Sequence, residues 1–267
     1  MSNILKTILD AKKTEVKRKK KDLSLKEITL SIDSSIIKRQ FESALKDKLT
    51  NGLPGVIAEC KKGSPSKGLL VKEYDPANIA AQYQKSGAAC ISVLTDEKFF
   101  YGDEKDLEAV AATVKLPILR KDFIIDPYQV YETHLMGADC ILLIVSCLNY
   151  QSLDKLYNLS REIGLDVLVE VHDKEELEVA KKIGATLIGV NNRNLKKFQT
   201  SIENSLLLAK NFPSNSVIIS ESGISSLEDV KKLRNTKINC FLIGETFLVS
   251  ENIQDKFIEL FPDLKNN

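Results

Sequence analysis

A glutamate and a lysine stand two positions apart near the end of a short apolar run, and together they could transfer protons. Residues 55–61 read Gly-Val-Ile-Ala-Glu-Cys-Lys, so Glu59 and Lys61 follow small and β-branched residues typical of a strand. Residues i and i+2 of a strand face the same side. We therefore expect a carboxylate and an ammonium group side by side at the carboxyl end of a strand. The loop that follows is rich in Gly, Ser and Pro, includes Ser64, and could approach a phosphate.

Other apolar runs carry charged residues of the same kinds. Lys121 follows one run, Glu170 lies within another, and Glu221 ends a third. Charged groups inside apolar strands are costly to bury unless they are paired. We therefore expect these three to meet Glu59 and Lys61 at one place and to compensate one another. An ion network with a purely structural role would use the same residues, but unlike charges at the ends of several strands are more typical of a functional site.

The apolar runs themselves indicate parallel strands. They are short, continuous and rich in Ile, Val and Leu, as expected for strands that are buried on both faces. Amphipathic segments separate them, and three of these segments end in Gly-Ala, at 87–88, 137–138 and 184–185. The expected helix N-caps are Asp75, Asp103, Asp126, Asp173 and Ser226. The expected strands are residues 56–60, 89–94, 118–120, 140–145, 167–171, 187–190, 217–220 and 240–243.

Eight strand–helix units in residues 55–267 predict an α/β fold, the closed (β/α)8 or TIM barrel. A doubly wound open sheet is the alternative. It usually has fewer strands, and no Gly-x-Gly-x-x-Gly follows the first strand here. The barrel would place its functional groups at the carboxyl ends of the strands.

Residues 1–50 predict an N-terminal helical extension, so that residues 1–267 form a single domain of extension plus barrel. Apolar residues from Ile4 to Val16 recur at helical spacing, with lysines expected on an opposite, solvated face. A second helix is expected over residues 35–49, and the Asn-Gly-Leu-Pro-Gly sequence at 51–55 would end it.

The ends of the last two expected strands predict a phosphate site. Ser222 and Gly223 follow one of these strands, and Gly244 and Glu245 follow the other. In this fold the loops after strands 7 and 8 often hold phosphate, and glycine lets backbone N–H groups approach its oxygens. The hydroxyl group of Ser64 could add a donor. We therefore expect a phosphorylated small-molecule substrate.

The composition is that of an ordinary globular protein. The net charge of +1 gives no global argument for nucleic acid, and no apolar run has the roughly 18 residues that indicate a membrane helix. The five cysteines are odd in number and form no Cys-x-x-Cys pair, so we expect a reducing, cytoplasmic compartment. His134 and His172 are too few and too separated for a zinc site. His172, just after a strand, is interpreted as structural or as polar lining.

No acidic cluster for Mg²⁺ and no Walker motif is present. We therefore expect no metal and no cofactor, and general acid–base chemistry on a carbon skeleton. A lysine could instead form a Schiff base, and the residue pattern alone does not separate the two roles.

Taken together, the motifs resemble the indole-3-glycerol-phosphate synthase family of tryptophan biosynthesis. The resemblance runs in order through nearly the whole chain, and its longest motif is Ile-Ala-Glu-Cys-Lys-Lys-Gly-Ser-Pro-Ser-Lys-Gly. It implies a TIM barrel preceded by helices. It also implies cyclisation of 1-(2-carboxyphenylamino)-1-deoxyribulose 5-phosphate to indole-3-glycerol phosphate, with loss of CO₂ and water. The motifs are residues 57–68, 94–102, 119–124, 169–172, 189–195, 220–224 and 242–245.

The resemblance also implies residue roles. Lys121 resembles the general acid that protonates the ketone oxygen. Glu170 resembles the base that also stabilises positive charge on the anilino nitrogen. Lys61 resembles the lysine that pairs with the substrate carboxylate and assists decarboxylation and dehydration, and Glu59 would support it or handle protons in dehydration. Asn191 and Arg193 resemble a polar pair that lines the site, and Glu221 a further catalytic carboxylate; Ser64, Ser222, Gly223, Gly244 and Glu245 correspond to the phosphate loops; Phe99 and Phe123 resemble the apolar wall against the anthranilate ring.

Two rival interpretations were weighed. Another phosphosugar barrel, such as phosphoribosylanthranilate isomerase, would use an acid–base pair of Cys and Asp, whereas this chain presents lysines and glutamates. A non-catalytic nucleic-acid-binding protein would use the basic stretch 12–21. We expect instead an enzyme without nucleic acid or membrane partners, as a monomer or homodimer.

Overall fold

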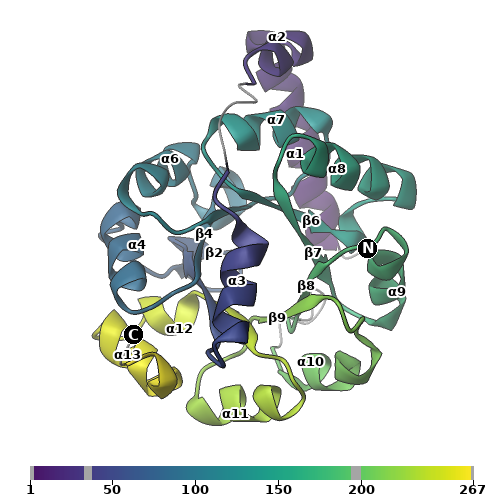
Figure 1. Ribbon diagram of the computed structural model, residues 1–267. Helices are drawn as coiled ribbons and strands as arrows, with labels where there is room; N and C mark the ends of the chain where they lie inside the picture. The colour runs from purple at the N-terminus through teal and green to yellow at the C-terminus, as the bar shows by residue number, and fades with distance from the viewer. Residues whose placement is uncertain (1–2, 33–37, 194–199, 266–267) are drawn as a thin grey trace.

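The computed structural model describes residues 3–32, 38–193 and 200–265. Eight parallel strands form a closed barrel in the order β1-β10-β9-β8-β7-β6-β5-β4, which confirms the predicted (β/α)8 fold (Figure 1). The barrel closes where β1 pairs with both β4 and β10, Ile57 opposite Cys90 and Gly55 opposite Cys240. The strands are β1 Gly55–Cys60, β4 Cys90–Leu94, β5 Ile118–Lys121, β6 Cys140–Ile144, β7 Asp166–Val171, β8 Leu187–Asn191, β9 Val217–Glu221 and β10 Cys240–Ile243.

A ring of helices surrounds these strands (Figure 1). Each of the five predicted N-cap side chains accepts a hydrogen bond from a backbone N–H group of the first helical turn. Each Gly-Ala repeat places its glycine just after a helix in the left-handed region, as at Gly137 with φ 81°. The helices of the ring are α4 Pro76–Lys85, α6 Glu104–Thr113, α7 Pro127–Leu135, α8 Tyr150–Glu162, α9 Lys174–Lys182, α10 Glu203–Leu208, α11 Leu227–Asn235 and α13 Ile253–Leu260.

Short elements occupy the loops between strands and helices. A two-stranded hairpin, β2 Gly63–Ser64 with β3 Gly68–Leu69, lies in the loop after β1. One-turn helices follow β4 and β10, α5 Glu97–Phe100 and α12 Glu245–Leu248. Single 3₁₀ turns are η1 Val145–Cys147, η2 Ala209–Asn211 and η3 Pro262–Leu264. None of the helices in the described ranges is long and apolar enough to cross a membrane.

Helix α3, Phe41–Thr50, covers the amino end of the barrel (Figure 1). Its Phe41 and Leu45 are fully buried and pack against barrel residues such as Ile57 and Leu119. Inward-facing side chains from β4 to β10 complete this inner cluster, so the barrel is a filled core rather than a pore.

The helix predicted over residues 35–49 begins later than expected. Residues 35–37 lie outside the described residues, and residues 38–40 are not helical. The Asp139 carboxylate accepts hydrogen bonds from the backbone N–H and from Nε of Arg39, at 2.8 and 2.7 Å. Lys38 Nζ donates to the His134 carbonyl at 2.8 Å. These bonds hold the segment extended, so the helix begins at Phe41. A preceding helix, α2 Leu25–Leu30, was not predicted.

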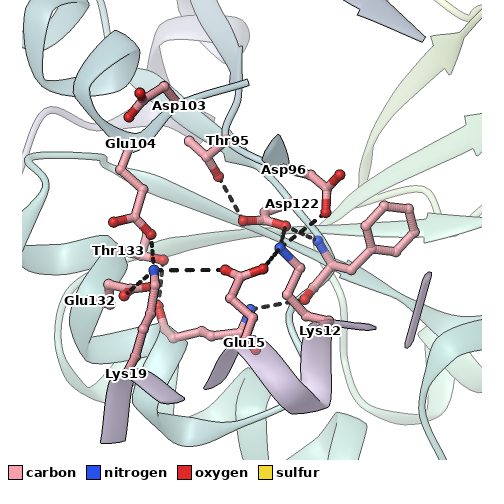
Figure 2. A network of polar contacts seen from close by, with 12 residues as sticks. Lys12, Glu15, Lys19, Thr95, Asp96, Asp103, Glu104, Asp122, Glu132 and Thr133 are labelled. Carbon is pink, nitrogen blue, oxygen red and sulfur yellow. Dashed lines mark hydrogen bonds and ion pairs between the residues drawn. The ribbon is translucent and has the colours of Figure 1, made fainter. Parts of the chain in front are cut away.

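The lysines of helix α1, Asn3–Asp22, were expected to lie on a solvated face, and this expectation is wrong for some of them. Lys12 is only 1% exposed, and its Nζ lies 3.1 Å from Asp96 and 2.9 Å from Asp122, in the segments after β4 and β5 (Figure 2). Lys19 pairs with Glu104 and Glu132. Lys12 and Lys19 are therefore part of the docking surface of α1, where carboxylates replace water, whereas Lys13, Lys17 and Lys21 are exposed as expected.

Arg120 of β5 extends the same network behind the strand. It is fully buried and pairs with Asp122 at 3.2 Å and with Glu132 at 2.8 Å. Although burial by itself raises the pKa of Asp122, Lys12 and Arg120 outweigh it and lower that pKa to about 2. Asp122 is therefore ionised at neutral pH, and the Lys12–Asp122 contact is an ion pair in the interior.

Candidate active site

A cavity of about 430 Å³ opens at the carboxyl ends of the barrel strands. Thirteen of the fourteen predicted site residues line it, so side chains from six strands and their loops meet at one mouth. Those that line the cavity are Glu59, Lys61, Ser64, Lys121, Phe123, Glu170, Asn191, Arg193, Glu221, Ser222, Gly223, Gly244 and Glu245.

The five charged groups expected to meet form two adjacent ion pairings. Lys61 Nζ lies 2.8 Å from Glu59 Oε1, as the i, i+2 spacing on one strand requires. Lys121 Nζ lies 3.5 Å from Glu170 Oε2 and 3.4 Å from Glu221 Oε2. The side chain of each carboxylate is at most 6% exposed, so the pairs compensate buried charges while facing an open cavity.

Two glycines make room for these carboxylates. A Cβ atom at Gly189 of β8 would overlap Oε1 of Glu221, and one at Gly244 would come within 2.8 Å of Oε1 of Glu59. The carboxylates therefore lie across the neighbouring strand ends, where any larger residue would displace them. The positions of Glu59 and Glu221 therefore depend on the register of their own strands and on a glycine in the neighbouring strand or loop, which leaves space for the carboxylate.

Asn191 and Arg193 continue the site along β8. Asn191 Nδ2 donates to Glu170 Oε1 at 3.2 Å, and its Oδ1 accepts the Arg193 N–H at 2.9 Å. Arg193 Nη1 donates to Ser66 Oγ at 2.8 Å, which links this loop to the loop after β1. Asn194 and Leu195, also part of the motif at 189–195, lie outside the described residues.

Burial and pairing set the ionisation of the central groups. Burial alone lowers the pKa of Lys121, but Glu221 and Glu170 outweigh it, so that pKa is raised and the side chain is an ammonium at neutral pH. Burial raises the pKa of Glu170, but Lys121 and His172 outweigh it and hold that pKa below its ordinary value. Lys61 and Lys121 likewise lower the pKa of Glu59 against the effect of burial. A protonated lysine, Lys121, therefore lies beside an ionised glutamate, Glu170, at the cavity.

Glu221 behaves differently from the other two carboxylates. Burial, with Glu170 and Glu59 nearby, outweighs Lys121 and raises the pKa of Glu221 to about 8. Neither of its buried oxygens accepts a hydrogen bond within the part of the chain that the structure describes. Glu221 is therefore largely protonated at neutral pH and can hold a proton beside Lys121.

This assignment predicts a pH-dependent stability difference for Glu221→Gln. A folded-state pKa of about 8 lies above the ordinary glutamate value of about 4.3. The stability from the bound proton is complete below about pH 4.3 and is lost as the pH rises to about 8, by at most about 1.4 kcal/mol per unit. We expect urea unfolding between pH 5 and 9 to show wild type losing free energy of unfolding relative to Glu221→Gln up to about pH 8. A difference that stays constant with pH would contradict the assignment; exposed Glu108→Gln is the control.

The apolar part of the cavity differs in one residue from the prediction. Phe123 lines it, and its ring lies 6.0 Å from that of Phe100, which also lines it. Phe99 is not among the lining residues. Phe99 and Phe100 both belong to the one-turn helix α5, in which successive side chains point about 100° apart. Phe100 faces the cavity, and Phe99 points elsewhere.

Helix α1 supplies a wall that the sequence analysis did not predict. Ile4, Leu5 and Ile8 line the cavity opposite the strand ends. Their spacing predicts a helix, but it does not indicate which surface of the barrel the helix covers. The signal that could have placed it is charge: Lys12, Glu15 and Lys19 continue the same stripe at three- and four-residue spacing and require buried partners.

The loops after β9 and β10 form the far side of the cavity. Ser222 and Gly223 are both left-handed, with φ 69° and 75°, and Asn192 Nδ2 donates to the Ser222 carbonyl at 3.0 Å. Glu245, after β10, lies 3.4 Å from Lys67 and 3.9 Å from Arg193. The described residues contain no group of three or more His, Cys, Asp or Glu side chains placed to hold a metal ion.

Known proteins similar to this chain decide its family. The family model for indole-3-glycerol phosphate synthase matches residues 5–260. A protein named indole-3-glycerol phosphate synthase from Polaromonas sp. (strain JS666 / ATCC BAA-500) is 46% identical over 98% of this chain and 99% of its own. Another of that name, from Delftia acidovorans, is 43% identical over 98% of this chain and all of its own. The chain belongs to the indole-3-glycerol phosphate synthase family.

As a member of the indole-3-glycerol phosphate synthase family, the protein is a carboxy-lyase of tryptophan biosynthesis that acts on a phosphorylated small molecule. Solved structures of lower identity share the fold alone. Thiamine phosphate pyrophosphorylase from Pyrococcus furiosus is 13% identical with a TM-score of 0.60, over 81% of this chain and 96% of its own. N-acetylmannosamine-6-phosphate 2-epimerase from Clostridium perfringens is 17% identical with a TM-score of 0.57, over 74% and 90%.

Proposed function

We propose that Lys121 and Glu170 carry the ring closure of indole-3-glycerol-phosphate synthesis as general acid and base. The observation that supports this most directly is their position, 3.5 Å apart and open to the cavity, with ionisation states opposite in sign. When the substituted ring carbon of the substrate attacks the ketone, Lys121 donates a proton to the developing alkoxide. Glu170 stabilises the positive charge on the anilino nitrogen, which keeps its proton, and as base takes up the C–H proton that is lost when the double bond of the pyrrole ring forms.

Lys61 is proposed to bind the substrate carboxylate. Its partner Glu59 leaves the remaining ammonium protons of Lys61 available to a second carboxylate. Loss of CO₂ returns the bonding electrons to the ring and restores its aromaticity, so the reaction needs no cofactor as an electron sink. The hydroxyl group then takes a second proton and leaves as water, while the adjacent ring carbon loses a proton and the double bond of the pyrrole ring forms. Lys61 assists both steps, Glu59 supports it, and Glu221 is a further carboxylate of the site.

The remaining groups are proposed to bind the substrate. The phosphate is held by Ser64, Ser222, Gly223 and the Gly244–Glu245 turn, where backbone N–H groups can approach its oxygens. Asn191 and Arg193 form the polar side, and Phe123 with Phe100 packs against the anthranilate ring. The separation of charged and apolar walls in one cavity supports this orientation.

Removing the Ser222 hydroxyl is expected to weaken substrate binding more than turnover. A hydroxyl–phosphate hydrogen bond is worth about 1.5–3 kcal/mol, so KM should rise roughly tenfold or more while kcat changes little. Ser222→Ala and Ser222→Gly are compared, because Ser222 is left-handed and glycine relieves that strain. Steady-state fluorescence of the indole product measures both constants, since the protein has no Trp. A large loss of kcat at constant KM would contradict the assignment.

We further propose a single-domain cytoplasmic enzyme, a monomer or homodimer, without nucleic-acid or membrane partners. A net charge of +1 supports the absence of a nucleic-acid partner. The burial of Lys12 and the pairing of Lys19 and Lys20 with carboxylates remove part of the basic stretch that such a partner would need. The packing of α1 and α3 against the two ends of the barrel supports one domain.

A further inference from the structure

His172 lies directly behind the proposed base. It follows β7, two residues after Glu170, so both side chains face the same side of the strand. His172 Nε2 lies 3.5 Å from Glu170 Oε1, and its Nδ1 lies 3.0 Å from Glu176 Oε2 in the first turn of α9. The imidazole is thus placed between two carboxylates and is not among the residues that line the cavity. It can act on the substrate only through Glu170.

Glu176 determines which ring nitrogen carries a proton. Its Oε2 also accepts the backbone N–H of His172 at 2.8 Å, which fixes that oxygen beside the ring. Nδ1 therefore carries hydrogen, because two lone pairs would otherwise face each other. Nε2 then faces Glu170 either as a second N–H, in the imidazolium, or as a lone pair that tolerates only a protonated Glu170. The ionised form of Glu170 and the charged form of His172 therefore occur together.

The charges around the ring favour the imidazolium. Glu170 of β7 and Glu176 of α9, with Glu221 of β9 in its ionised form, act on it in the same direction, and their combined effect exceeds that of burial, so the pKa of His172 is raised. Lys121 of β5 faces the other oxygen of Glu170, and Asn204 of α10 donates to the His172 carbonyl at 2.9 Å. Nε2 is buried and makes no hydrogen bond within the described ranges, which leaves it directed at Glu170.

We propose that His172, held by Glu176, is a positioning residue that keeps Glu170 ionised and its Oε1 turned toward Asn191. Lys121 neutralises one oxygen of the carboxylate and His172 the other, while Asn191 restrains its rotation. When Glu170 takes up the substrate proton, the pair loses the attraction that held the imidazolium. This inference rests on the proposed role of Glu170 as base.

The first test does not use activity. The chain has two histidines, so a ¹H–¹³C spectrum labelled at histidine Cε1 has two signals, and His172→Asn assigns them. We expect the His172 pKa in the free enzyme to lie above the ordinary value of about 6.5, and to fall by about one unit in Glu170→Gln. Glu178→Gln, an exposed glutamate on the same helix, should leave it unchanged. A His172 pKa that is the same in Glu170→Gln and wild type overturns the proposal.

The second test is the pH profile of kcat/KM. In His172→Asn, loss of the cation should move the acidic limb upward by about one unit, because Glu170 then holds its proton to higher pH. Glu176→Gln should move it in the same direction by less, and Glu178→Gln should not move it. The substrate phosphate is common to all variants, so it cannot produce a difference. An acidic limb at the wild-type pH in both His172→Asn and Glu176→Gln contradicts the proposal.

The catalytic role of Lys121 and the positioning role of His172 are tested by different measurements. If Lys121→Ala retains turnover, the proposed acid is wrong, but a His172 titration that depends on Glu170 would still stand. If the titration is independent of Glu170, the positioning role is wrong whatever the catalytic assays show.

Discussion

Replacing Lys121 by alanine is expected to lower kcat by roughly 10²-fold or more, the usual scale for losing a general acid. Lys121 is the only described ammonium group within ion-pair distance of both Glu170 and Glu221. Without it, the alkoxide formed on ring closure must take its proton from water. Product fluorescence at saturating substrate measures the effect on kcat directly, without a contribution from weaker binding.

A matched variant separates proton donation from charge. Lys121→Arg keeps a positive charge beside the two glutamates, but a guanidinium is not deprotonated in proteins and cannot act as the acid. We expect Lys121→Arg to be about as slow as Lys121→Ala, although better folded, because its charge still compensates the carboxylates. Near-normal turnover in Lys121→Ala would remove Lys121 from the reaction. Near-normal turnover in Lys121→Arg alone would reduce its role to electrostatic stabilisation.

Replacing Lys12 by methionine is expected to cause the largest loss of stability among these variants. Lys12, Asp96 and Asp122 are each at most 2% exposed, and both aspartates lie within 3.1 Å of the ammonium nitrogen. Breaking a buried pair leaves an uncompensated charge and costs about 3–5 kcal/mol. For a chain of this size the midpoint of thermal unfolding should fall by roughly 10 °C. Circular dichroism at pH 7 measures it.

The neighbouring lysine provides the control. Lys13 is 67% exposed and pairs with Asp10 on the surface, so Lys13→Met should change the midpoint very little. Asp122 keeps its ion pair with Arg120 in Lys12→Met, so adding Asp96→Asn removes the carboxylate that lost its ion-pair partner and should restore part of the loss. Equal midpoints for Lys12→Met and Lys13→Met would show that the buried contact contributes nothing to stability.

The barrel could be predicted because its signals are local and repeated. Strands buried on both faces are continuously apolar, and five helices of the ring begin at an Asp or Ser whose capping role depends only on adjacent residues. The predicted strands agree with the observed ones to within one residue at each end. The meeting of Glu59, Lys121, Glu170 and Glu221 followed from topology, because parallel strands of one barrel end at the same face.

The helices before the barrel were predicted less well for two reasons. One is a missed local signal: Ser24 and Glu27 form a capping box at the start of α2. The other is tertiary. The start of α3 is set by contacts of Lys38 and Arg39 with residues about a hundred positions away, and no local pattern contains that information. The burial of Lys12 belongs to the same class, since an isolated helix would leave it in water.

The contacts of His172 also could not be predicted from the sequence. The sequence analysis interpreted it only as structural or as polar lining, because its relation to the proposed base depends on Glu176, which the first turn of α9 places beside it. Whether Phe99 or Phe100 faces the cavity depends similarly on the rotation of one short helical turn.

The buried lysine of α1 has a consequence for the order of events during protein synthesis. The ribosome makes α1 before the barrel strands, and Asp96 and Asp122 emerge only later, when β4 and β5 have been added. Until then Lys12 has no interior partner, and burying it would cost several kcal/mol. The nascent helix α1 therefore stays undocked until these partners are present, and its lysines remain hydrated. Helix α1 thus adds its wall to the cavity only after β4 and β5, which follow it in the chain, have been made.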